Sequence, residues 1–273
     1  MSTFQISDLF HTSWDSLTPK KCWRIIFGMR VYAAIHQTDK KRLDSELATA
    51  ADFMLEALKA AALPGKWKLI NKQTTNEQKI DIYHDLFFHK EEYPFRHFPI
   101  ANFSSLRNGL RLTAPEEAMS NCTYGQFKYA DNEFSKMVMA KEQGDEQAAE
   151  EQINRLVASV YLPKSGKFQK NATDQLADKI GRVAFPWQKE LVVEAYANTR
   201  QGIIARCPTF WPQPEESAEP TAAQATGPQW HELHFNIAES EVFKGFTTVD
   251  QANMYDVFDY LEALAKRKTT KTQ

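Results

Sequence analysis

Apolar residues recur at helical spacing along most of this chain and predict a mainly α-helical body. They repeat every three or four residues in five stretches, near residues 18–33, 41–62, 123–138, 146–161 and 186–206. Thr18 followed by Pro19 is typical of a helix start, because proline fits the first helical position. Gly144 and Asp145 break the pattern between the third and fourth stretches, so we expect a helical hairpin there.

The pattern is less regular between residues 67 and 112. Short apolar groups around Trp67, Ile80 and Leu110 are interrupted by Pro94, Pro99 and scattered Asn and Gly residues. This arrangement predicts short strands or extended loops, and thus a short irregular or β-containing insertion in the helical body.

Two segments have the spacing of a capping box, in which Ser or Thr is followed three residues later by Glu or Gln. The two side chains satisfy backbone N–H groups that have no partner at a helix start. Thr123 and Gln126 therefore predict the start of the central hairpin, and Thr248 and Gln251 predict the start of a final helix.

A polar stretch at residues 212–228 separates the body from a short tail. It holds four prolines and three glutamates but no aromatic residue and no Leu, Ile or Val. Such a composition cannot bury enough apolar surface to offset the entropy of ordering, so we interpret it as a tether. The expected organisation is a helical body at residues 1–211, the tether at 212–228 and a tethered C-terminal helical segment at 229–273.

The tail carries an apolar stripe at helical spacing, which we expect to be a partner-docking surface because a lone helix of this length is marginal in water. Docking could occur on the chain's own body, on a second copy or on another protein. Aromatic residues with no periodic neighbour are further contact candidates. The predicted docking residues are Trp230, Met254, Val257, Phe258, Leu261 and Leu264.

Composition and charge narrow the classes of function. The chain has 42% hydrophobic and 25% charged residues, as an ordinary globular protein does. A net charge of −2 provides no general field for nucleic acid or an anionic membrane, so neither is an expected partner. Three widely spaced cysteines, with neither a secretory leader nor an apolar run of membrane-spanning length, favour a cytoplasmic protein with free thiols.

Histidines are the candidates for metal chemistry. His84, His89 and His97 lie among carboxylates, but His84 and His89 are five residues apart and fall on roughly opposite sides of a helix or strand. His231 and His234 are three apart, whereas the metalloprotease helix needs a spacing of four. We expect no metal and no cofactor, and the alternative is a metal-dependent enzyme site around residues 84–97.

The middle of the chain carries a series of capping, turn and core positions: Phe98, Pro99, Leu106, Leu110, Leu112, Pro115, residues 123–127, Tyr129, Ala130, Asp131, residues 156–158, Tyr161 and Pro163. In these positions the chain resembles proteins in the structural gene clusters of tailed phages and of phage-derived elements of Bacteroidetes-type bacteria. The resemblance implies a tail component or tail-assembly factor, and it transfers no catalytic residue.

These expectations combine into one hypothesis. The chain is a non-enzymatic protein–protein interaction protein that binds other subunits, such as components of a phage-like particle or further copies of itself. It would reside in the cytoplasm or in an assembled virion-like particle. An enzyme with a site around residues 84–97 is the alternative.

Overall fold

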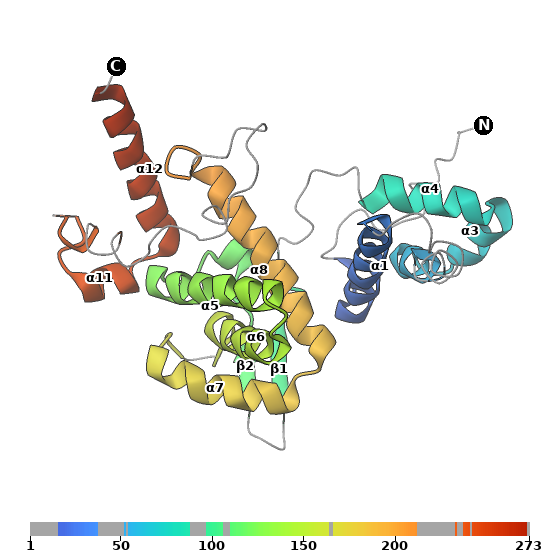
Figure 1. Cartoon of the computed structure of the whole chain (residues 1–273), viewed down its shortest axis with the longest axis horizontal. Helices are drawn as coiled ribbons and strands as arrows, with labels where there is room; N and C mark the ends of the chain where they lie inside the picture. Colours follow the sequence, from blue (N-terminus) through green and yellow to red (C-terminus); the bar gives the residue numbers. More distant parts are fainter. Residues whose placement is uncertain are drawn as a thin grey trace. The chain divides into compact units, whose positions relative to one another are not determined.

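The computed structural model describes residues 16–37, 52, 54–87, 97–105, 110–163, 166–211, 233, 237–240 and 242–271. The fold is mainly α-helical with one small antiparallel sheet, as predicted (Figure 1). The chain divides into two compact units, Met1–Phe95 (unit 1) and Arg96–Gln273 (unit 2). This division differs from the expected boundary at residue 211, because the C-terminal helix packs within unit 2. The predicted tether at residues 212–228 lies outside the described residues.

Unit 1 is built from helices around a small aliphatic core. Helix α1 spans Pro19–Gln37 and starts as predicted, with the N–H groups of Lys21 and Cys22 donating to the Thr18 carbonyl at 2.9 and 3.0 Å. Residues 54–61 are helical, followed by α3 (Trp67–Gln73) and α4 (Asn76–Phe87). The core comprises Ile25, Met54, Ala57, Leu58, Ala60, Ala61, Ala62 and Ile70.

Helices α3 and α4 replace the strands or extended loops expected after residue 67. A capping box that the sequence analysis missed explains the second helix. The Gln78 N–H donates to Thr75 Oγ1 at 3.2 Å, and the Thr75 N–H donates to Gln78 Oε1 at 2.9 Å. These reciprocal bonds satisfy the donors at the start of α4, so Ile80 lies on a helix rather than on a strand.

Unit 2 contains the predicted β insertion. Strands β1 (Asn102–Ser105), β2 (Leu110–Thr113) and β3 (Leu162–Pro163) form an antiparallel sheet in that order. Leu112 pairs with Phe103 on one side and with Pro163 on the other. Tyr161 ties the sheet to the preceding loop: its hydroxyl donates to the Ile100 carbonyl at 2.7 Å, and its ring packs edge-on against Phe103 at 4.8 Å.

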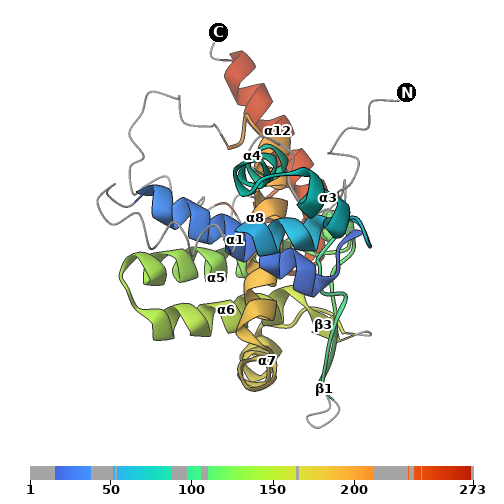
Figure 2. The same cartoon turned by 90° about the vertical axis from the view of Figure 1, so that its right-hand side faces the viewer.

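The predicted hairpin is formed by α5 (Tyr124–Glu142) and α6 (Glu146–Val160), which lie side by side and antiparallel in Figures 1 and 2. A short 3-10 turn, Glu117–Met119, precedes it. Helix α8 (Pro186–Arg206) packs across the hairpin within the predicted bounds. Helix α7 (Lys170–Val183) packs on α6 and was not predicted, because its buried stripe consists of small or isolated side chains: Thr173, Ala177 and Ile180.

The predicted cap of α5 is half correct. Thr123 Oγ1 accepts a hydrogen bond from the Gln126 N–H at 3.2 Å, as expected of an N-cap. The Gln126 side chain does not complete the box. It is buried and donates to the Ser159 carbonyl at 2.8 Å, which fastens α5 to the end of α6.

The predicted cap of the last helix is wrong. Thr248 and Gln251 lie inside a separate helix, α11 (Phe246–Gln251), and α12 (Met254–Lys271) begins after it. Asn253 caps α12 instead, because its Oδ1 accepts from the Tyr255 N–H at 2.9 Å.

We expect Thr123→Ala to lower the free energy of unfolding of unit 2 by ~1 kcal/mol, because the Gln126 N–H loses its acceptor. Thr123→Ser retains the oxygen and should cost much less. Chemical denaturation of both variants measures the difference. Equal midpoints for the two variants would show that the side-chain bond does not stabilise α5.

Candidate interaction site

The predicted docking stripe lies on α12, and most of it is buried in the chain's own core. Met254, Val257, Phe258 and Leu261 are buried, while Leu264 is half-buried. The stripe is therefore a contact within unit 2, which is the first of the three alternatives, and its four buried residues are not exposed for a second copy or another protein. Trp230 lies outside the described residues.

Phe258 is the centre of this contact. Its ring packs edge-on against Phe127 at 5.1 Å and against Tyr124 at 6.1 Å, both on α5. Trp211, in the turn after α8, packs on the same ring at 5.0 Å. Each buried apolar side chain contributes roughly 1.5–3 kcal/mol, so the four buried residues of the stripe contribute on the order of 6–12 kcal/mol. That is as large as the stability of a typical domain.

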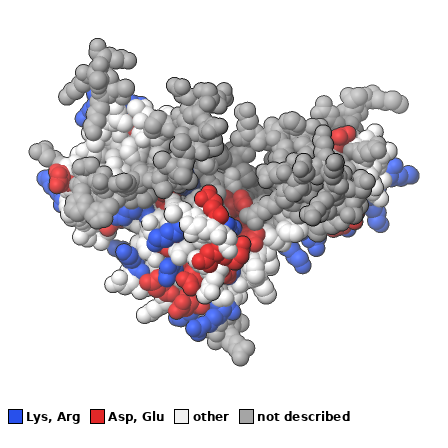
Figure 3. Space-filling model, viewed as in Figure 1, with Lys and Arg blue, Asp and Glu red and all other residues white. Residues whose placement is uncertain are grey.

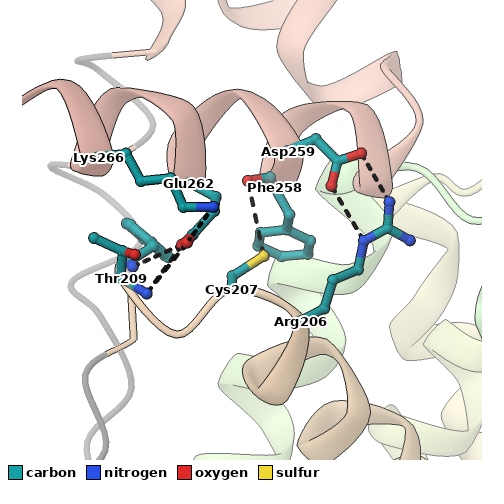
Figure 4. A network of polar contacts seen from close by, with 8 residues as sticks. Arg206, Cys207, Thr209, Phe258, Asp259, Glu262 and Lys266 are labelled. Carbon is teal, nitrogen blue, oxygen red and sulfur yellow. Dashed lines mark hydrogen bonds and ion pairs between the residues drawn. The ribbon is translucent and has the colours of Figure 1, made fainter.

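Polar contacts between α12 and the end of α8 form a second layer around Phe258, shown in Figure 4. Arg206 and Asp259 form a two-pronged ion pair, with Nε–Oδ1 and Nη2–Oδ2 distances of 3.1 and 2.8 Å. Glu262 accepts hydrogen bonds from the N–H groups of Thr209 and Phe210 at 3.1 and 2.9 Å. We call this group of residues the polar clasp: Arg206, Thr209, Phe210, Asp259 and Glu262.

The environment of the clasp shifts the pKa values of Glu262 and of the neighbouring Cys207. Burial acts to raise the pKa of Glu262, but hydrogen bonds from Thr209, Phe210 and Lys266 outweigh it and the pKa is lowered. Burial, with the nearby charges of Glu262 and Asp259, raises the pKa of the Cys207 thiol to about 11. Cys207 is therefore a protonated thiol near neutral pH, not a reactive thiolate.

The start of α12 also holds the loop before α5. The side-chain amide of Asn253, the cap of α12, donates to the Ser120 carbonyl at 2.7 Å, and the Tyr255 hydroxyl donates to the Ala118 carbonyl at 2.7 Å. Ala118 and Met119 have positive φ angles of 49° and 60°, a conformation that costs free energy for residues other than glycine. Contacts from α12 therefore stabilise a strained loop about 130 residues earlier in the chain.

Few of the candidate metal-binding histidines fall on described positions. His84 lies on α4 and His97 is exposed in unit 2, whereas His89, His231 and His234 lie outside the described residues. Within the described part of the chain, no group of three or more His, Cys, Asp or Glu side chains is arranged to hold a metal ion.

Although the stripe is buried, other apolar side chains lie at the surface. Phe185, before the first turn of α8, is 62% exposed, and Val242, before α11, is 64% exposed. Neither belongs to a helical repeat, so periodicity could not identify them as surface residues. On the face of unit 2 seen in Figure 3, acidic and basic side chains are interspersed over the helices.

Comparisons of the chain with protein-family models, with curated proteins and with solved structures find no match. None of the helices that the structure describes is both long and apolar enough to span a membrane. The class of protein is therefore defined here by its fold, which is a mainly α chain of two units with a C-terminal helix integrated into the second.

We expect Phe258→Ala to destabilise unit 2 by ~3–5 kcal/mol, the usual cost of truncating a buried phenylalanine. Unit 1 has a separate core and should keep its protection from hydrogen exchange. Arg267→Ala, an exposed change on the same helix, is the control and should stay within about 0.5 kcal/mol of wild type. Full protection of α5 in Phe258→Ala would show that α12 is not part of this core.

Glu262 should make stability depend on pH. Because its pKa is lower in the folded protein than in the unfolded chain, its contribution is present above the unfolded value of about 4.3 and is lost as the pH falls through the folded value. Glu262→Gln should therefore lower the denaturation midpoint of unit 2 at pH 7 and have a smaller effect at pH 3. An equal loss at both pH values would mean that the carboxylate charge is not the stabilising feature.

Proposed function

We propose that this protein is a non-enzymatic interaction protein, and that it serves as a structural or assembly component of a phage or phage-tail-like particle. The observation that carries the proposal is the location of the residues on which the phage resemblance rests. Phe98, Leu112, Phe127, Leu156 and Tyr161 are all buried in unit 2. A resemblance carried by core positions concerns the fold rather than a catalytic site.

The use of charged groups in unit 2 supports the same proposal. Asp131 on α5 pairs with Arg200 on α8, and Lys189 on α8 pairs with Glu150 on α6. Both pairs join separate helices of unit 2. A rigid helical body with exposed apolar side chains, such as Phe185, is suited to fixed contacts with neighbouring subunits.

Deletion of the gene in a host that carries the particle should give incomplete particles by electron microscopy. Wild-type protein supplied in trans should restore them. Phe185→Asp should restore them poorly if this side chain is a subunit contact. Gln175→Asp, which adds the same charge at an exposed position of α7, should restore them fully.

Complete particles of normal yield in the deletion strain would contradict the proposed function. The circular dichroism spectrum of Phe185→Asp should match that of wild type, because the side chain is mostly exposed. If Phe185→Asp restores particles as well as Gln175→Asp does, the subunit contact lies elsewhere on the surface.

A further inference from the structure

Lys79 on α4 is a buried cation without a negatively charged partner among the described residues. It is 5% exposed. Its Nζ donates to the side-chain oxygens of Asn71 at 2.8 Å and Asn76 at 3.1 Å, and both acceptors are neutral amides. An ammonium group has three hydrogens to donate, so one remains after these two bonds.

Among the described residues, the other buried charged side chains differ from Lys79 in this respect. Each of them has a partner of opposite charge: Asp131 with Arg200, Glu133 with Lys136, Lys189 with Glu150, and Glu262 with Lys266. Lys189 is the close parallel, because it also contacts an asparagine oxygen, that of Asn154 at 3.1 Å. Lys79 contacts two asparagine oxygens in the same way, but it contacts no carboxylate among the described residues.

Three lysines of the neighbouring sequence, Lys66, Lys68 and Lys72, are exposed on or beside α3, and the acidic residues Glu77 and Asp81 follow on α4. The corner itself is well ordered by local bonds, since the Thr74 hydroxyl donates to the Ile70 carbonyl at 2.7 Å and Ile70 lies in the core. A buried charge is costly unless an opposite charge compensates it, and Lys79 has no such charge beside it within the described part of the chain.

We infer that the α3–α4 corner of unit 1 is an oxyanion-binding site, and that its occupant is a carboxylate on an acidic segment of a partner protein. The carboxylate would take the third hydrogen of Lys79, and the exposed amides of Asn71 and Asn76 would supply further donors. The oxyanion site stands by itself, whereas the choice of a protein partner rests on the proposed assembly function.

Hydrogen exchange of the full-length chain, followed by mass spectrometry, tests the site. Acetate or phosphate, compared with chloride at equal ionic strength, should slow exchange in residues 66–87. The expected slowing is about tenfold when the anion is at ten times its dissociation constant. Lys79→Met should abolish the effect. Lys59→Met, which removes an exposed lysine paired with Glu56 in the same unit, should retain it.

Asn71→Asp provides a second variant that does not remove Lys79. It places a carboxylate where an amide oxygen lies 2.8 Å from Nζ, so it should slow exchange at the corner in chloride alone and remove the response to added anion. The site is overturned if wild type shows no anion response, or if Lys79→Met responds as wild type does. Either result leaves the particle-assembly proposal untouched.

The nature of the partner is tested by competition between a hexaglutamate peptide and a hexathymidylate oligonucleotide at equal ionic strength. Protection of residues 66–87 by hexaglutamate, lost in Lys79→Met, supports a protein carboxylate. Stronger protection by the oligonucleotide overturns the protein assignment and makes a nucleic-acid phosphate the ligand.

Discussion

The burial of Phe258 against α5 and the turn after α8 is the contact on which unit 2 depends. Its ring joins three segments that are distant in sequence, through Tyr124, Phe127 and Trp211. The aromatic contact fixes where α12 lies, and this position brings Asp259 and Glu262 within reach of the end of α8. It also places the start of α12 against the strained loop at Ala118. The clasp and the loop geometry are thus consequences of one apolar contact.

The two units use buried charge in different ways. In unit 2 each buried ionic group that the structure describes is matched by an opposite charge, and the cross-helix pairs are internal joints between α5, α6 and α8. In unit 1 the buried Lys79 contacts two amide oxygens and no carboxylate among the residues that the structure describes. A buried charge without a counter-charge is costly, which is why we propose an anion as its partner. Under our proposals, unit 2 provides the scaffold and the α3–α4 corner of unit 1 the recognition site.

Local sequence signals predicted much of the helical framework. Pro19, Thr123, Pro186 and the break at Gly144 each act on the backbone of their immediate neighbours, so α1, the α5–α6 hairpin and α8 were found within a few residues of their bounds. The same logic applied to α4, where Thr75 and Gln78 form a capping box that was overlooked. Helix α7 gave no comparable signal, because small side chains make its buried face.

The sequence by itself determined that the tail would form an apolar helix whose stripe had to be covered, since an isolated helix of that length is marginal in water. It could not determine what covers the stripe, because apolar burial is non-directional and accepts any surface of matching shape. Only the tertiary structure decided that the cover is α5 of the same chain. Likewise, the sequence showed several lysines near Lys79, but only the fold revealed that Lys79 is buried and has no counter-charge among the described residues. Burial and pairing depend on elements that meet in space.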